Sequence, residues 1–311
     1  MNKWMIVFLL AIVSLAATCG EPAPAPKLVQ ESETGITHTF VVFGGATYVV
    51  GKDSTITHRY PFGTRDGWML PNGNLLSAVS KNKEYPGGAI VEVDKDGKKV
   101  FEFKGSQVEV HSVQPLENGN IVMTEGGPKP KLMEITREGK VVVEFALKCQ
   151  VPNAHMQTRM ARKLPNGNYL APHLLDRVVR EYKPDGTVVS EIKTPDEPKD
   201  SWPFTAIRLD NGNTLINCTH GNMVQEVDKD GKVVWQLTNK DLPSPMLADP
   251  CGAQRLANGN TIICSYGAGK ADAVKAFEVT PDKKVVWTFK TNNGDHLHEI
   301  HVIDPGEKSL K

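Results

Sequence analysis

Short alternating apolar runs, separated by Asn-Gly and Asp-Gly pairs, follow one another along most of the chain. A pentapeptide that begins with Leu and ends with Asn-Gly-Asn occurs five times, at residues 70–74, 116–120, 164–168, 209–213 and 256–260. The glycines of these pentapeptides are 46, 48, 45 and 47 residues apart. This even spacing indicates an internal repeat of about 45 residues.

Each repeat predicts four short antiparallel strands. One apolar stretch precedes the Asn-Gly turn, a second follows it, and two more flank a second turn. These later hairpins are VEVDKDGKKVFEF (91–103), MEITREGKVVVEF (133–145), REYKPDGTVVSEI (180–192), QEVDKDGKVVWQL (225–237) and FEVTPDKKVVWTF (277–289). Asn-Gly and Asp-Gly supply the positive φ of a tight turn, and β-branched or aromatic residues flank them, as in β-hairpins.

Four strands in a repeat of this length are typical of a β-propeller blade. Five blades are complete in sequence, and the sixth is split between the two ends. Residues 296–306 match the first strand, while 38–45 and 47–60 match the other three. Pairing of the two ends would close the ring and cover its open sheet edges. We therefore predict an all-β, six-bladed propeller of four-stranded blades, forming a single domain over residues 36–311.

The N-terminus carries a targeting pattern. Residues 1–18 combine a positive charge, a short apolar run and small residues, which is typical of a secretory signal peptide and too short for a membrane span. Cys19 resembles the acceptor of a bacterial lipoprotein; the alternative is cleavage after Ala16 or Ala17. Residues 19–35 are predicted to form a Pro-rich tether. We expect an exported, periplasmic or cell-surface protein that contacts a membrane only through a lipid on Cys19.

Composition narrows the function further. Lys and Arg total 36, as do Asp and Glu, so the formal net charge is zero, which argues against a nucleic-acid partner. With 40% hydrophobic and 23% charged residues, the chain is an ordinary folded protein, expected to be a monomer. Cys149, Cys218, Cys251 and Cys264 allow three full disulfide pairings, and the sequence does not choose among them.

The unit LPNGNxL…VxExDxDGKVVWxF resembles the repeat of the PQQ-like and arylsulfotransferase-like propeller families, over roughly residues 36–303. The resemblance implies the propeller fold, whereas function has to be argued from a site. Quinoprotein dehydrogenases of this group have eight blades, so six blades argue against PQQ as a cofactor. The arylsulfotransferase resemblance implies a histidine that carries a sulfuryl group, and no local motif assigns that role to one histidine here.

Comparison of the repeats separates scaffold from site. Residues that recur at one position in the blades are expected to be scaffold. Five glutamates of the third strand belong to this group and are predicted to tie blades together: Glu92, Glu134, Glu181, Glu226 and Glu278. Residues that differ between blades at equivalent positions are candidates for function.

The first residues of each innermost strand are expected to line the mouth of an axial pocket. Eight positions before each turn glycine the blades carry Arg65, His111, Arg159, Phe204, Cys251 and His298. The second strands end at the same face with Lys81, Glu125, His173, His220 and Tyr266. Deeper positions of the innermost strands are Trp68, Gln114, Arg162, Ile207, Gln254 and His301.

Arginine and histidine together predict a site for an anionic small molecule or glycan, such as a uronate or a sulfate ester. The predicted substrate-binding residues are Arg65, Arg159, Arg162, His173, Trp68 and Gln114. The predicted acid, base or nucleophile residues are His111, His298, His220 and Tyr266. Under the alternative, the arginines and histidines only bind carbonyl groups or pair with Asp66 and Glu299.

Two functions stay open at this point. One is an enzyme acting in the axial pocket, as a carbohydrate lyase or hydrolase or an arylsulfotransferase-like transferase. The other is a non-catalytic cell-surface propeller that binds a glycan or a protein through loops such as 81–85 and 126–131. A divalent metal held by His111, His173, His220 and His298 is a further alternative, although no residue is assigned as a metal ligand.

Overall fold

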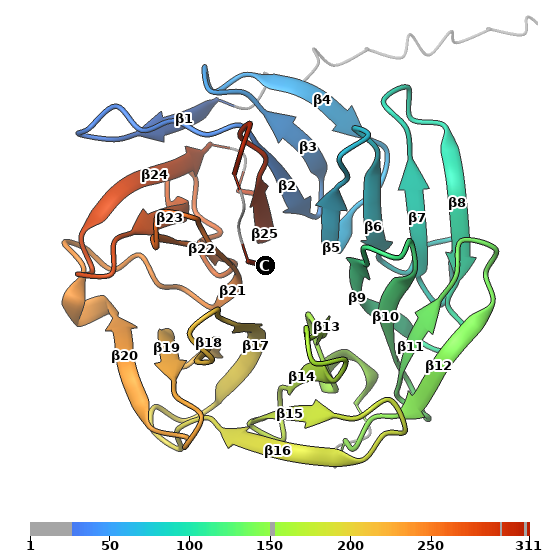
Figure 1. Cartoon of the computed structure of the whole chain (residues 1–311). Coiled ribbons are helices and arrows are strands. Elements are labelled where there is room, and N and C mark those ends of the chain that lie inside the picture. The colour runs from blue at the N-terminus through green and yellow to red at the C-terminus, as the bar shows by residue number, and fades with distance from the viewer. Residues whose placement is uncertain (1–26, 150–152, 293, 308–309) are drawn as a thin grey trace, which may run out of the picture.

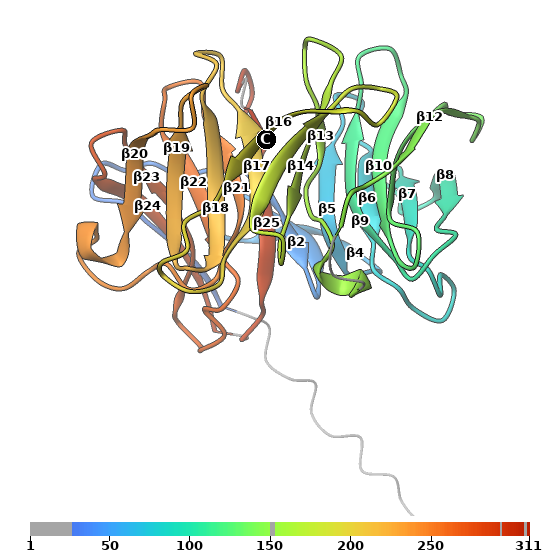
Figure 2. The same cartoon turned by 90° about the horizontal axis from the view of Figure 1, so that it is seen from below.

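The computed structural model describes residues 27–149, 153–292, 294–307 and 310–311. The predicted signal peptide and Cys19 lie outside these residues. Six antiparallel sheets stand around a common axis, each with four or five strands (Figure 1). The predicted six-bladed β-propeller is therefore confirmed. Seen from the side, the innermost strands run along the axis of the ring (Figure 2).

The blades follow one another in chain order, and each runs from its innermost to its outermost strand. The first blade has β5 (Thr64–Met69), β6 (Leu75–Val79), β7 (Ala89–Val93) and β8 (Lys99–Lys104). The second has β9 (Glu109–Pro115), β10 (Ile121–Gly126), β11 (Lys131–Ile135) and β12 (Val141–Ala146). The third has β13 (Arg162–Lys163), β14 (Tyr169–His173), β15 (Val178–Tyr182) and β16 (Val188–Lys193).

The remaining blades complete the circle. The fourth has β17 (Ser201–Arg208), β18 (Thr214–His220), β19 (Met223–Val227) and β20 (Val233–Thr238). The fifth has β21 (Pro250–Arg255), β22 (Thr261–Ser265), β23 (Val274–Val279) and β24 (Val285–Thr291). The sixth joins β25 (Leu297–Val302) to β2 (Phe40–Gly44), β3 (Thr47–Val50) and β4 (Ile56–Tyr60). Two single-turn 3₁₀ helices, η1 (Ala154–Met156) and η2 (Asn239–Asp241), lie in connections between blades.

The ring closes as predicted, by pairing of the two ends of the chain within the sixth blade. Phe40 lies opposite Val302, and Val41 lies opposite His301, in an antiparallel register. Apolar side chains of neighbouring sheets pack between the blades, so the core is a set of clusters at the blade junctions. One of them joins Phe40 and Tyr48 of the sixth blade to Phe289 and Trp287 of the fifth.

Part of the segment predicted as a tether is instead a strand. Leu28–Glu31 forms β1, which pairs with the outer edge of β24 and gives the fifth blade a fifth strand. Leu28 is buried in the cluster between the fifth and sixth blades. The segment is ordered because it pairs the free backbone groups of an edge strand while burying an apolar side chain.

The glycine of the first turn has the same conformation in all six blades, although the sixth blade has Pro-Gly in place of Asn-Gly. Gly73 is at φ 83°, Gly259 at 86°, and Gly306 of the divided blade at 82°. These values lie in the left-handed region, where glycine carries no steric penalty. The match at Gly306 supports the assignment of residues 296–306 to the first strand of the sixth blade.

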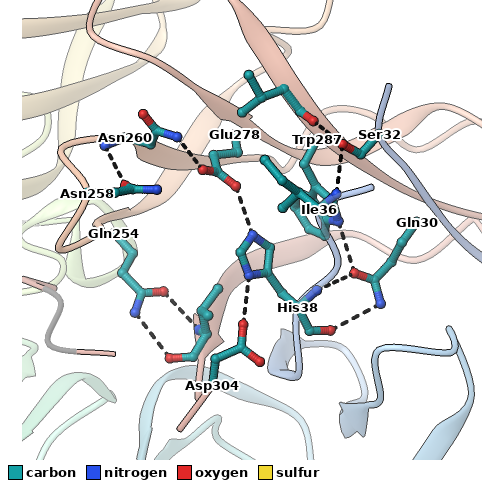
Figure 3. Close-up of polar contacts among 12 residues, drawn as sticks. Gln30, Ser32, Ile36, His38, Gln254, Asn258, Asn260, Glu278, Trp287 and Asp304 are labelled. Carbon is teal, nitrogen blue, oxygen red and sulfur yellow. Dashed lines mark hydrogen bonds and ion pairs between the residues drawn. The ribbon is translucent and has the colours of Figure 1, made fainter. Parts of the chain in front are cut away.

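The recurring glutamates tie neighbouring blades together, as predicted. Each accepts a hydrogen bond from an asparagine of its own blade: Asn74, Asn120, Asn168, Asn213 and Asn260, in chain order. Each also binds a basic side chain of the following blade: Arg137, Lys163, Arg208, Arg255 and His38. Figure 3 shows the last of these links, in which His38 lies between Glu278 and Asp304.

Within the described residues, no helix has both the length and the apolar character needed to cross a membrane.

Candidate functional site

The innermost strands carry a β-bulge at the positions predicted to form the ring. In β5 the pairing register skips Arg65, in β9 it skips His111, in β17 Phe204, and in β25 His298. In β21 the break falls between Pro250 and Ala253, around Cys251. A bulge re-aims a side chain away from strict alternation. It lets Arg65 and the next residue, Asp66, both point toward the axis, which a regular strand would forbid.

Five of the six ring residues line one axial cavity of about 480 Å³. They are Arg65, Arg159, Phe204, Cys251 and His298. His220 and Tyr266, predicted from the second strands, also line it. The other walls come from Asn153, His155, Met156, Leu174, Leu175, Trp202, Thr219 and Asp249.

Arg159 is the buried positive charge of this cavity. Its guanidinium group hydrogen-bonds the Nδ1 atom of His111 and the carbonyl oxygen of Thr158. Among the described residues no carboxylate lies within ion-pair distance of it. Burial, together with the nearby charge of Arg65, lowers its pKa to about 9. His111 lies fully buried behind it, and burial and the two arginines hold its pKa well below the ordinary value.

Glu109 organises the other positive groups. Its carboxylate lies 3.1 Å from Arg65 Nη2, 3.0 Å from Lys81 Nζ and 3.1 Å from His155 Nδ1. Burial opposes the ionisation of Glu109, but the hydrogen bond from His155 and the charge of Arg65 outweigh it and hold its pKa far below the ordinary value. Glu109 thus pairs with Arg65 and Lys81, whereas Arg159 has no carboxylate within ion-pair distance among the described residues.

Aromatic rings also line the cavity, and the guanidinium carbon of Arg159 lies 5.5 Å from the centre of the Phe204 ring. The His298 ring lies 6.2 Å from that of Phe204 and 4.7 Å from that of Tyr266. Trp202 and His220 pair their rings at 4.1 Å. Burial and the neighbouring arginines lower the pKa of His298 to about 3, so its imidazole is neutral at physiological pH. Its buried Nδ1 atom has no hydrogen-bond partner among the described residues.

Four predicted site residues lie elsewhere. Arg162 is held by two hydrogen bonds to the buried carboxylate of Asp66, and Trp68 donates to the carbonyl oxygen of Val113. Gln114 accepts a hydrogen bond from the Lys163 backbone and so links two blades. These positions lie deeper along the strands than the cavity, where the innermost strands of different blades are close enough to bind one another.

His173 is the fourth. It is buried within the third blade, where Tyr182 lies 2.8 Å from its Nε2 atom and Cys149 lies 3.5 Å from its Nδ1 atom. Burial lowers its pKa to about 4. Of the other second-strand residues, Lys81 approaches Glu109 at the cavity edge, and Glu125 is buried against Ser106.

The comparison of repeats did not predict several residues of the candidate site. His155 stands on η1, in the connection between the second and third blades and outside the repeated strands, so the comparison of repeats did not identify it. Trp202 and Asp249 lie two positions before the ring residues Phe204 and Cys251. Glu109 has the same offset from His111. A comparison of the repeats at the position two residues before each ring residue would have identified Trp202, Asp249 and Glu109.

No group of three or more potential metal-ligating side chains occurs in the part of the chain that the structure describes. His111, His173 and His298 point to separate partners, and His220 lies beside Asp249, with its Nε2 atom 3.8 Å from the carboxylate. Cys149, Cys218, Cys251 and Cys264 are free thiols. The arrangement therefore offers an anion one buried guanidinium and one neutral imidazole, with aromatic walls beside them.

Comparison with known proteins adds family information for part of the chain. A family model described as Mal s 1 allergenic protein-like matches residues 93–242. No curated protein matches the sequence. The PQQ-like or arylsulfotransferase-like resemblance is not confirmed by the family match.

Solved structures resemble the whole ring. A protein of unknown function from Bacteroides caccae has a TM-score of 0.75 at 21% identity, covering 86% of this chain and 100% of that one. The periplasmic gluconolactonase of Pseudomonas aeruginosa has a TM-score of 0.59 at 12% identity, covering 87% and 100%. Virginiamycin B lyase from Staphylococcus aureus has a TM-score of 0.56 at 14% identity, covering 86% and 99%. At these identities the likeness shows the fold alone: the chain is a β-propeller, and residues 93–242 are similar to the Mal s 1-like family.

Proposed function

We propose that the protein binds a small organic anion in its axial cavity. The observation that carries this proposal is Arg159, a guanidinium group with 3% of its surface exposed and no carboxylate partner among the described residues. A buried charge without a counter-ion is costly. A carboxylate, sulfate or phosphate that enters the cavity would supply the missing charge and two acceptor oxygens for the fork of the arginine.

The other side chains that line the cavity favour a ligand of a particular shape. Trp202, Phe204 and Tyr266 offer aromatic faces, and Leu174 and Met156 add apolar surface. A flat or ring-shaped ligand with one anionic group fits this combination, because its ring can stack on the aromatic side chains while its anionic group pairs with Arg159. Aryl sulfates and aryl carboxylates match it best, and a uronate stacking one sugar face is the carbohydrate that matches.

His298 takes part as a hydrogen-bonding group. An imidazole with a pKa of about 3 is a poor proton acceptor at neutral pH. Its free Nδ1 atom can instead bind a polar group of the ligand, which would satisfy a buried atom now without a partner. Binding is therefore the function that the geometry supports best.

A catalytic role is the second candidate, and the pair of His220 and Asp249 favours it. Asp249 accepts a hydrogen bond from the His220 backbone and lies 3.8 Å from its Nε2 atom, at the cavity wall. A carboxylate next to an exposed imidazole can orient it for proton transfer. The phenol of Tyr266 lines the same cavity. This pair would serve an elimination or a hydrolysis.

Thermal unfolding with a ligand panel tests the proposal. The panel contains aryl sulfates, aryl carboxylates, uronates and the matching neutral compounds. At about 100 times its Kd, a ligand stabilises the fold by about 2.7 kcal/mol. We expect a higher Tm with the anions only. Arg159→Ala should abolish the shift, whereas Arg177→Ala, which alters an arginine paired with Asp196 on another part of the surface, should retain it.

Equal shifts with neutral compounds, or an unchanged shift in Arg159→Ala, would contradict the anion site. Incubation of any anion that binds, followed by product analysis, separates the two candidates. Turnover that His220→Ala removes without loss of binding would establish the catalytic role. Binding without product would leave the cavity as a binding site.

A further inference from the structure

Lys311 is buried near the centre of the propeller ring, close to the axial cavity. The end of the chain marked C lies at the centre of the ring in Figure 1, with the innermost strands around it. Leu310 forms an isolated antiparallel bridge with Arg255, and Arg162 donates a hydrogen bond to the main-chain oxygen of Lys311. The lysine side chain is completely buried.

The ammonium group of Lys311 lies in a cage of acceptors and aromatic rings. It donates a hydrogen bond to the carbonyl oxygen of Gly67 and lies 3.1 Å from Glu299 and 3.6 Å from Asp66. The centre of the Trp68 ring is 4.4 Å away and that of Phe43 is 5.0 Å away. We call these five residues the ammonium cage: Phe43, Asp66, Gly67, Trp68 and Glu299.

The cage is built for a compact cation. Two carboxylates, one carbonyl oxygen and two ring faces surround one point, and each of these groups attracts a positive charge. Neither carboxylate oxygen of Glu299 has a hydrogen-bond partner among the described residues, so the ion pair with Lys311 is the interaction that supports it. Burial raises the pKa of Glu299 to about 8 and lowers that of Lys311.

The bulges connect the cage to the axial cavity. Asp66 directly follows Arg65, and Glu299 directly follows His298. Because Arg65 and His298 are the bulged residues, all four side chains face the channel. The cage residues Asp66 and Glu299 thus directly follow two residues that line the axial cavity.

We propose that the ammonium cage is a binding site for primary alkylammonium groups, for which Lys311 is the tethered occupant. The site is separate from the proposed anion site, because it shares no residue with the walls of that cavity. A free amine of matching length should enter the cage once the lysine side chain is shortened. Its chain would follow the path of the lysine methylenes, and its ammonium group would restore the pairing with Glu299 and Asp66.

Chemical rescue tests this proposal. Lys311→Ala leaves a cavity and removes the cation beside Glu299, while Asp66 keeps its pairing with Arg162, so we expect its Tm to fall by on the order of 10 °C. n-Butylammonium should restore most of that loss, whereas n-butanol, which has the shape but no charge, should not. Lys232→Ala, at an exposed lysine of a turn, should keep the wild-type Tm with and without the amine.

Lys311→Met provides the matched variant. Its side chain fills the path of the methylenes but has no charge, so it should be destabilised and should not respond to n-butylammonium. An equal response in both variants would place the amine elsewhere and overturn the proposal. So would a Lys311→Ala protein of unchanged Tm, or one that the amine does not rescue.

If Lys311→Ala does not fold, the wild-type protein still gives a result. Reductive methylation followed by mass spectrometry should modify Lys311 far more slowly than Lys232, because the cage shields its amine. Equal rates would contradict the cage. Arg159→Ala distinguishes the two sites: it should abolish the Tm shift by anions and leave the protection of Lys311 unchanged.

Discussion

Single residues of one chemical type have different functions in this propeller, according to their position in the blade. Arg208 and Arg255 bind a glutamate of the preceding blade, and Arg162 binds the buried Asp66. Arg159 has no carboxylate partner among the described residues. The paired arginines hold the ring together, and the unpaired one points to a ligand, so pairing separates scaffold from candidate site better than residue type does.

The scaffold role of the recurring glutamates can be tested at Arg208. Arg208→Ala removes the cation from the buried Glu181 and should lower the free energy of unfolding by about 1–3 kcal/mol. Arg208→Lys keeps the charge and should cost less. Urea denaturation measures both. Loss of anion binding at unchanged stability would show instead that this glutamate belongs to a functional site.

At the level of strands, irregularity positions the candidate site. Alternation alone would send Arg65 and Asp66, or His298 and Glu299, to opposite faces of their sheets. The bulges turn both members of each pair toward the axis. The spacing of the repeats identified the ring positions. A bulge, however, depends on backbone pairing with the neighbouring strand, which no spacing reveals, so the depth of each side chain could not be predicted.

Besides pairing with β24, the added strand β1 is held by the side chain of Gln30. Its side-chain amide donates to the carbonyl oxygens of His38 and Gly51, and its oxygen accepts from the His38 backbone and the Trp287 indole (Figure 3). The side chain therefore joins the outer edge of the fifth blade to the sixth. A Pro-rich tether would leave these four groups without this partner.

Replacement of Gln30 tests the contribution of β1. Gln30→Ala leaves four partly buried polar groups without their partner, and we expect a loss of about 2–4 kcal/mol in the free energy of unfolding. Glu31→Ala, in the same strand, removes only a contact with Lys290 at the surface and should cost less than about 1 kcal/mol. If both substitutions lowered the free energy of unfolding equally in urea denaturation, the hydrogen bonds of Gln30 would contribute little to stability.

At the scale of the whole molecule, the link between the fifth and sixth blades differs from the other links between blades. We call this link, formed by Glu278, His38 and Asp304, the closing seam. Four of the recurring glutamates bind Arg or Lys, and the fifth, Glu278, binds His38. Burial disfavours the charged imidazole, but Glu278 and Asp304 outweigh that effect and raise the pKa of His38 above 6.5. Lys52 lies 3.2 Å from Asp304 and is the other charged group at this point.

The seam should therefore weaken as the pH rises. A raised pKa in the folded state adds stability that is fully present below pH 6.5 and is lost as the pH rises through the folded-state pKa. Glu299, with its pKa raised to about 8, acts in the same direction, so the wild-type profile combines both groups. The difference between wild type and His38→Gln isolates His38. It should shrink in urea denaturation as the pH rises above 6.5 through the raised pKa of His38, and a constant difference would contradict a charged His38.

The sequence by itself determined the architecture of this protein: the repeat length, the four strands of each blade, the split sixth blade and the glutamates that link blades. These follow from local rules, because turn glycines and alternating apolar residues act within a few positions of one another. Only the tertiary structure decided which side chains meet on the axis. Arg159 without a carboxylate, Arg162 on Asp66 and Lys311 in its cage depend on bulges and on contacts between blades far apart in sequence, and those distances exist only after the ring has closed.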